Sequence, residues 1–193
     1  RGGVELVVVP TRAFVSTDPA FLRRILQNLL SNALRYGRSE GRPPRVLLGC
    51  RRVPNAVNGG ELRIEVKDNG PGIAQDKQII IFDEFVRLQP EDEAPREERG
   101  LGLGLAIVDR IARMLDLPVG LASAPGRGST FSVIVPRVPA VLVRDGEPRV
   151  REAPRQQRPA VALGRLQQRL EVRVLGLVLE PAQLPLVHGV ALH

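Results

Sequence analysis

The sequence predicts an α+β fold, a two-layer sandwich in which helices cover one face of a mixed sheet. Two long segments, residues 19–36 and 103–115, carry apolar side chains at helical spacing. Residues 61–68 instead alternate strictly between apolar and polar, as in a strand with one buried face. At 193 residues, 43% of them hydrophobic, the chain is long enough for one domain with a sizeable core.

The first strand and the first helix have clear boundary signals. Residues 4–9 form an apolar run that Pro10 ends, and Asp18 with Pro19 suits the N-cap and first position of a helix. The helix is expected to end near Tyr36. Its apolar stripe consists of Leu22, Ile25, Leu26, Leu29, Leu30, Ala33 and Leu34.

The remaining elements follow in order. Residues 46–50 are expected to form a strand, and in the alternating segment Leu62, Ile64 and Val66 share one face. After the second helix, residues 119–122 and 129–135 are expected to form two closing strands. A turn of sequence Pro-Gly-Arg-Gly at residues 125–128 joins them.

Composition excludes several classes of protein. The formal charge is +7, but lysine occurs only at Lys67 and Lys77, and aromatic residues make up 3%, so nucleic-acid binding is not favoured. The single cysteine, Cys50, excludes a disulfide framework and a cysteine-ligated zinc site. No run approaches the roughly 18 apolar residues of a membrane span, so no membrane contact is expected.

Four polar residues share one face of the first helix. Asn28 and Asn32 lie four residues apart, and Arg35 and Tyr36 follow one turn later. Amide oxygens suit a hard cation such as Mg²⁺, and an arginine suits phosphate oxygens. On spacing alone, the alternative remains open that both amides bond to local backbone or face solvent.

A glycine-rich segment of sequence Asp-Asn-Gly-Pro-Gly-Ile follows the alternating strand at residues 68–73. Asp68 places a carboxylate at the strand end, where it can accept from an exocyclic amine such as that of adenine. Gly70 and Gly72 allow backbone to approach a ligand closely. A plain turn explains the same residues equally well, because Asn-Gly is a strong turn dipeptide.

Three alternating glycines, Gly100, Gly102 and Gly104, stand where the second helix begins. There they free backbone N–H groups to approach an anion at the positive end of the helix. A dinucleotide fold would need a strand just before the glycines. Residues 89–99 are instead charged and contain proline, which indicates a mobile lid over a ligand.

A short amphipathic stretch, residues 81–87, precedes this lid. Its paired carboxylates, Asp83 and Glu84, are interpreted as a solvated face and not as an acid/base pair. Phe82 and Phe85 are expected to anchor the base of the lid by packing.

Together and in this order, these segments resemble the catalytic ATP-binding domain of bacterial sensor histidine kinases. The resemblance covers residues 4–137. It rests on an N box at Asn28–Tyr36, a first glycine box at Asp68–Gly72, an F box at Phe82–Phe85, a second glycine box at Gly100–Gly104, and a closing Gly126–Phe131.

The resemblance implies the Bergerat sandwich shared with Hsp90, gyrase B and MutL. It also implies ATP and Mg²⁺ as cofactors. Asn32 would hold the Mg²⁺ that bridges the phosphates, with Asn28 in support and Arg35 near the phosphates. Tyr36 would line the nucleotide pocket, and Asp68 would accept from the adenine amine.

The glycines and one hydroxyl complete the implied site. Gly70 and Gly72 would let backbone approach the base, while Gly100, Gly102 and Gly104 would anchor the lid beside the phosphates. Thr130 would support the adenine through its hydroxyl group.

One position separates the relatives chemically. Family members that hydrolyse ATP carry a glutamate where this chain has Asn28, and a neutral amide cannot take a proton from water. The resemblance therefore implies a phosphotransferase. A non-catalytic nucleotide-binding regulatory module is the alternative that the same residues leave open.

The implied phosphate acceptor is a histidine on a separate dimerisation domain, because His188 and His193 lack the family's sequence context. The resemblance further implies a homodimeric parent, a downstream response regulator and a cytoplasmic location, with membrane anchoring of the parent left open. Since Arg1 is not an initiator, the chain is expected to be a piece of something longer.

Three segments are expected. Residues 1–140 form the catalytic domain, and residues 141–153 resemble the start of a receiver domain. No aspartate follows Asp145, so the phosphate-accepting residue of a working receiver is absent. Residues 154–193 are expected to be a degenerate, frameshifted or disordered tail.

Overall fold

A six-stranded sheet forms one layer of the fold. The computed structural model describes residues 3–11, 13–38, 41–54, 60–88, 101–138, 140–142 and 148–150. The sheet consists of β1 (Glu5–Val8), β2 (Phe14–Val15), β3 (Arg45–Val53), β4 (Glu61–Asp68), β5 (Val119–Ser123) and β6 (Ser129–Val138). Its order is β1-β3-β4-β6-β2, and β5 also pairs with β6. Because β1 and β3 are parallel while the other pairs are antiparallel, the sheet is mixed, as expected.

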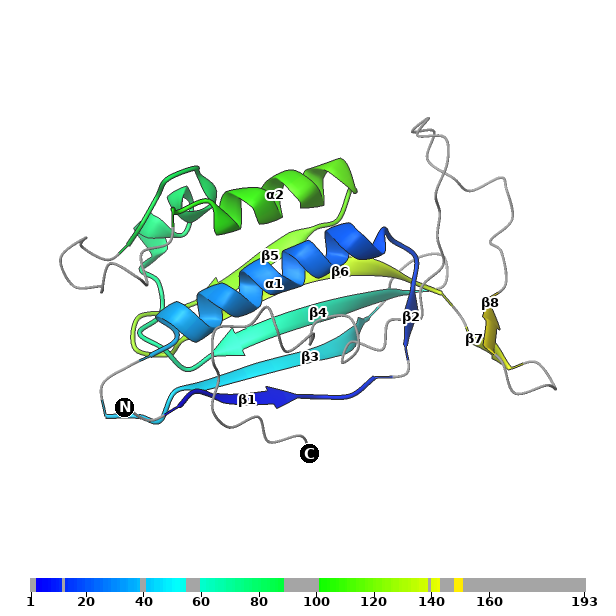
Figure 1. The fold of residues 1–193 in the computed structure, drawn as a ribbon, viewed down its shortest axis with the longest axis horizontal. Coiled ribbons are helices and arrows are strands. Elements are labelled where there is room, and N and C mark those ends of the chain that lie inside the picture. Colours follow the sequence, from blue (N-terminus) through cyan, green and yellow to red (C-terminus); the bar gives the residue numbers. More distant parts are fainter. Residues whose placement is uncertain are drawn as a thin grey trace.

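Two helices, α1 (Pro19–Tyr36) and α2 (Gly104–Met114), form the second layer. Figure 1 shows both on the same side of the sheet, with α1 running in nearly the same direction as the strands and α2 beside it. Two short 3-10 helices, η1 (Gln75–Lys77) and η2 (Ile80–Phe82), precede α2. The predicted α+β sandwich is therefore confirmed.

The core lies between these layers. All seven apolar residues predicted for the stripe of α1 are buried. Across from them, Leu62, Ile64 and Val66 of β4 are at most 3% exposed, which confirms the alternation. Burial of this kind stabilises a domain by about 25 cal/mol per Å² of apolar surface.

Most boundaries were predictable from local chemistry. Asp18 caps α1 as expected, because its Oδ1 accepts from the backbone N–H groups of Ala20 and Phe21 at 2.9 and 3.0 Å. The strand predicted at 46–50 is longer, since β3 extends to Val53 along its partner β4. The two-residue strand β2 was not predicted.

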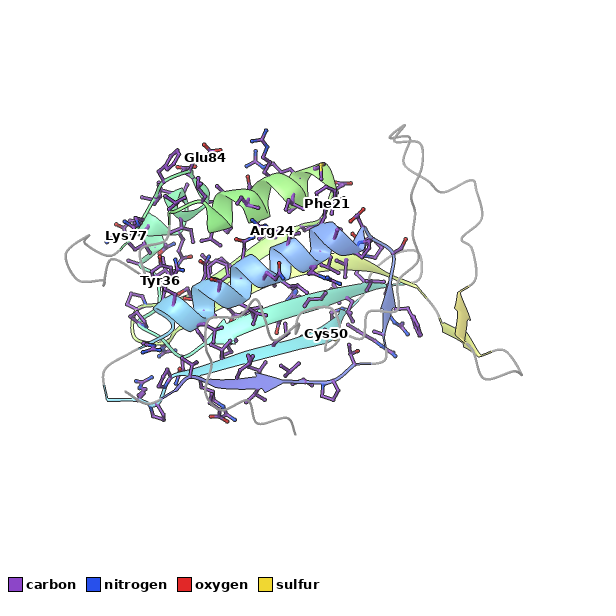
Figure 2. All side chains as sticks on the ribbon, viewed as in Figure 1. Phe21, Arg24, Tyr36, Cys50, Lys77 and Glu84 are labelled. Carbon is purple, nitrogen blue, oxygen red and sulfur yellow. The ribbon has the colours of Figure 1, made fainter. Side chains whose placement is uncertain are left out.

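The F box differs from expectation at one residue. Phe82 packs edge-on against Phe131, with ring centroids 6.4 Å apart. Phe85 is 68% exposed and has a φ of 65°, so the prediction that it anchors the lid by packing is wrong. The left-handed backbone turns its side chain away from the core. Asp83 and Glu84 are exposed, which agrees with the solvated interpretation. Figure 2 shows Glu84 at the outer edge of the molecule.

Beyond the main sheet, β7 (Ala140–Leu142) and β8 (Pro148–Val150) pair as a small antiparallel sheet. The expected lid (residues 89–99), the tail from residue 151 and both histidines lie outside the described residues. Within the described part, neither helix is long and apolar enough to cross a membrane.

Candidate functional site

Asp68, the last residue of β4, is a buried carboxylate at the edge of the core. It is 6% exposed, and its Oδ1 accepts from the backbone N–H groups of Gly70 at 2.9 Å and Ser129 at 3.2 Å. Burial raises the pKa of Asp68 above its ordinary value, and the two N–H donors oppose that rise. Both of these hydrogen bonds fall on Oδ1 and not on Oδ2, the other oxygen of the carboxylate.

The first glycine turn packs against the end of α1. A Cβ atom on Gly70 would lie 2.7 Å from the Cα of Gly37, the residue that caps α1, so only glycine fits there. Gly72 approaches the carbonyl groups of Ala124 and Gly128 in the same close way. The turn thus connects α1 with the β5–β6 turn, and Asp68 lies between them.

The register of β6 moves the predicted hydroxyl group away from Asp68. Thr130 pairs with Lys67 and Ala122, which are both exposed on the sheet face opposite Asp68. Ser129 is instead buried beside the Asp68 carboxylate. The structure therefore brings Ser129, and not Thr130, to this site.

Ser129 belongs to a small hydroxyl network. Its Oγ lies 3.0 Å from the Oγ of Ser123. Ser123 accepts from the N–H of Ile73 at 2.8 Å and donates to the carbonyl of Gly128 at 2.9 Å. Because Ser123 has only one proton, Ser129 donates to it and keeps its own lone pairs as acceptors.

The two asparagines of α1 meet the start of α2. The Nδ2 of Asn28 donates to the carbonyl of Arg24 at 2.8 Å, which leaves its Oδ1 pointing off the helix. A Cβ atom on Gly104 would lie 3.3 Å from that Oδ1 and 3.5 Å from the Oδ1 of Asn32. The second glycine box and the N box, far apart in sequence, are thus brought together.

The beginning of α2 is suited to an anion. Its N-cap, Leu103, provides no side-chain hydrogen bond, so the N–H groups of the first turn keep their partial positive charge for a ligand. Gly102, with a φ of 71°, accepts from the N–H of Phe85 at 3.1 Å and so holds the segment in place. Gly100 lies outside the described residues.

Arg35 and Tyr36 lie in the last turn of α1. Both are exposed, and the Cζ of Arg35 is 5.9 Å from the centroid of the Tyr36 ring. Figure 2 shows Tyr36 at the C-terminal end of the helix, next to the glycine turn. Neither side chain contacts the asparagine pair directly in the interactions that the structure shows.

The site has two ends, which lie at different points along α1. Asp68 lies at Gly37, where a Cβ atom would be 2.8 Å from that of the aspartate. Asn32 and Asn28 lie five and nine positions before Gly37, or roughly 8 to 14 Å along the helix. This arrangement suits an elongated ligand with a polar ring at Asp68 and an anionic chain at the asparagines.

A cation at the anionic end would depend on amide oxygens. Among the described residues, no cluster of three or more His, Cys, Asp or Glu side chains could hold a metal. Two amide oxygens, completed by water and ligand phosphates, match the hard oxygen donors that Mg²⁺ takes. Asn28 and Asn32 therefore fit a Mg²⁺ ion that arrives with a phosphorylated ligand.

Comparison with known proteins agrees with this geometry. The family model described as "Histidine kinase-, DNA gyrase B-, and HSP90-like ATPase" matches residues 17–139, more than half of the chain. The chain belongs to this ATPase family.

Curated relatives are sensor kinases. The chain is 34% identical over 119 residues to "Sensor histidine kinase RcsC" of Escherichia coli K12, which covers 62% of this chain and 11% of that protein. It is 36% identical over 143 residues to "Autoinducer 2 sensor kinase/phosphatase LuxQ" of Vibrio parahaemolyticus, covering 69% and 15%. It is also 36% identical over 130 residues to "Sensor-like histidine kinase SenX3" of Mycolicibacterium smegmatis. That match covers 67% of this chain and 31% of that protein.

Solved structures show the same relationship. The mycobacterial sensor histidine kinase MprB matches with a TM-score of 0.52 at 25% identity, over 70% of this chain and 81% of that one. Full-length ShkA in complex with AMPPNP matches with a TM-score of 0.53 at 33% identity, over 70% of this chain and 26% of that one. The chain is an ATP-binding catalytic domain of the sensor histidine kinase type. It spans less than a third of the length of the three curated relatives described here.

Proposed function

We propose that this chain binds Mg²⁺-ATP and transfers the γ-phosphate to a histidine on a separate dimerisation domain. The observation that carries the proposal is the meeting of Asn28 and Asn32 with Gly104 at the uncapped start of α2. That meeting creates one place with hard oxygen donors and N–H donors together, as a metal-bound phosphate chain requires.

At the other end, Asp68 recognises the base. Its Oδ2 accepts from the 6-amino group of adenine, while the N–H groups of Gly70 and Ser129 hold Oδ1 in place. Gly70 and Gly72 let the turn pack closely against the backbone of Gly37, Ala124 and Gly128, which holds it beside Asp68. Ser129 presents an additional acceptor, and Tyr36 lines the ring's edge.

At the phosphate end, Asn32 holds the metal and Asn28 supports it. Bound Mg²⁺ supplies charge neutralisation for the phosphates. The first-turn N–H groups of α2 bind phosphate oxygens, and Gly102 with Gly104 lets that backbone come close. Arg35 adds a positive charge on the same face of α1.

Transfer is favoured over hydrolysis because the residue beside the phosphates is an amide. Asn28 donates its Nδ2 to its own helix and carries no group that can remove a proton from water at neutral pH. The histidine acceptor brings its own ring nitrogen as the nucleophile. Positioning and charge neutralisation then carry the catalysis.

The wider system is proposed from the similarity of this chain to sensor kinases. A histidine-bearing dimerisation domain approaches the γ-phosphate, a response regulator receives the phosphate afterwards, and the parent protein is a homodimer. The reaction takes place in the cytoplasm, where ATP is available.

The test is transfer in trans. The chain is mixed with Mg²⁺, ATP labelled at the γ-phosphate and a histidine-bearing dimerisation domain, with a His→Gln version of that domain as control. Acid-labile label on the histidine form alone is expected. ATP binding without any transfer would instead assign the chain to the alternative class, a nucleotide-binding regulatory module.

A further inference from the structure

Asn69 holds the backbone at the point where the chain leaves β4. Its Oδ1 accepts from the N–H of Arg45 at 2.7 Å, and its Nδ2 donates to the carbonyl of Pro43 at 2.9 Å. Its own backbone N–H donates to the carbonyl of Arg45 at 3.3 Å. Three hydrogen bonds thus join one residue of the glycine turn to the start of β3.

The side-chain amide of Asn69 makes hydrogen bonds at the point where the ladder between β3 and β4 ends. The last pair of the β3–β4 ladder is Val46 with Asp68. Past Val46 the regular ladder ends, because Arg45 donates its N–H to the Asn69 side chain and not to a backbone carbonyl, and Pro43 and Pro44 have no N–H group. The Asn69 side chain, with one acceptor and two donor hydrogens, bonds to this backbone in place of a peptide group. It thereby sets the direction of the chain just after Asp68.

That direction determines where the Asp68 carboxylate points. The peptide after Asn69 carries the Gly70 N–H, which donates to Asp68 Oδ1 at 2.9 Å. Gly70 is also pressed against Gly37, so the turn has little room to find a second position. At the far end, the N–H of Gly126 holds the Pro71 carbonyl at 2.7 Å, independently of Asn69.

We propose that Asn69 is a positioning residue for base selection: its amide fixes the turn that aims Asp68 at the 6-amino group of adenine. The residue does not touch the nucleotide itself. The inference rests on the proposed function, since it names the residue that makes the same site selective for adenine over a purine with oxygen at position 6.

The test compares ATP with inosine triphosphate, which carries a carbonyl oxygen in place of the 6-amino group. Dissociation constants for both are measured on the whole chain and on Asn69→Ala. We expect the variant to bind ATP about tenfold more weakly while its affinity for inosine triphosphate changes by less than about twofold. Selectivity, and not binding in general, is the quantity that falls.

Two further variants sharpen the result. Asn69→Asp keeps an acceptor for the Arg45 N–H and loses the donor to Pro43, so it should retain part of the selectivity and provides a second folded test. Glu5→Gln is the matched control, because it removes the 3.3 Å ion pair with Arg45 at the same strand start without contacting Asp68. Its selectivity should equal that of the wild type.

The outcomes are distinguishable. Equal loss of affinity for both nucleotides in Asn69→Ala, or unchanged selectivity in Asn69→Ala and Asn69→Asp, overturns the inference and leaves the proposed function standing. Failure of the folded wild-type chain to bind either nucleotide overturns the proposed function itself, and the inference with it.

Discussion

Replacing Asp68 by asparagine separates base recognition from the architecture of the turn. Asn keeps an Oδ1 that can accept from the N–H groups of Gly70 and Ser129, now at 2.9 and 3.2 Å. The other oxygen becomes an NH₂ group, which opposes the 6-amino group of adenine donor to donor. A hydrogen bond to a charged group contributes about 1.5 to 3 kcal/mol, so ATP affinity should fall by roughly 10- to 150-fold.

The same change should improve binding of a purine with oxygen at position 6, because the new NH₂ group can donate to it. Calorimetric titration of Asp68→Asn with ATP and with inosine triphosphate measures both effects. If the variant binds ATP as tightly as the wild type does, Asp68 does not read the base and the reasoning fails.

Asp68→Asn should weaken ATP binding, but it should not lower the stability of the folded chain at neutral pH. Burial raises the pKa of Asp68 above its ordinary value of 3.8, so ionisation destabilises the folded state as pH rises through this range. This destabilisation is absent in acid, where Asp68 is protonated in both the folded and the unfolded chain. It is complete above the pKa of Asp68 in the folded state. Asp68→Asn removes it, so the variant should melt at an equal or higher temperature at pH 7, with a difference that shrinks towards acid. Thermal unfolding from pH 3 to pH 7 follows the trend, and a variant clearly less stable at pH 7 would contradict it.

Three other changes test separate parts of the molecule. Gly104→Val should push the asparagine pair aside, because a Cβ atom there would lie 3.3 Å from Asn28 Oδ1. The affinity for ADP should fall about tenfold, while the affinity for adenosine should stay unchanged. Equal losses of affinity for ADP and adenosine would contradict this prediction. Asn28→Glu should raise phosphate release from ATP by about tenfold or more, because the carboxylate supplies a general base. Asn28→Gln should not raise it. Equal phosphate release by the two variants would refute the hydrolysis argument. Asp18→Ala should cost about 1 kcal/mol in urea unfolding through loss of the helix cap, with Asp76→Ala, which caps nothing, as its control.

Local signals predicted much of the fold because they act over a few residues. The cap at Asp18 and the alternation of β4 are both properties of short segments, and both are confirmed. The strand β2 escaped prediction because two residues show no period, and only pairing with the distant end of β6 makes them a strand. Phe85 was misassigned because its left-handed backbone accompanies a hydrogen bond to Gly102, a residue distant from it in the sequence.

The candidate site shows the same division. The family resemblance implied that Asn28, Asn32 and Gly104 lie around the same phosphates, and the packing of α1 on α2 brings the three residues together. Thr130 was placed one residue out of register. The sequence did contain the corrective signal, since the apolar alternation of Phe131 with Val133 puts Ser129 on the core face.

Other contributions could not be seen in the sequence. The hydrogen bonds of Asn69 to Pro43 and Arg45, and the contact of Gly37 with Asp68, join segments more than 20 residues apart. No local pattern encodes them, because they arise only when β3, β4 and the end of α1 meet. Such long-range contacts are what turn a plausible glycine turn into a specific site.

The most direct test of the central claim is titration of a fluorescent ATP analogue into the whole chain, with and without Mg²⁺, beside Asn32→Ala and Asp68→Ala. The two-ended site predicts that Mg²⁺ strengthens binding to the wild type, that Asn32→Ala loses this strengthening, and that Asp68→Ala weakens binding even without metal. Absence of binding to the folded wild-type chain, or equal metal dependence in the wild type and Asn32→Ala, would contradict the account.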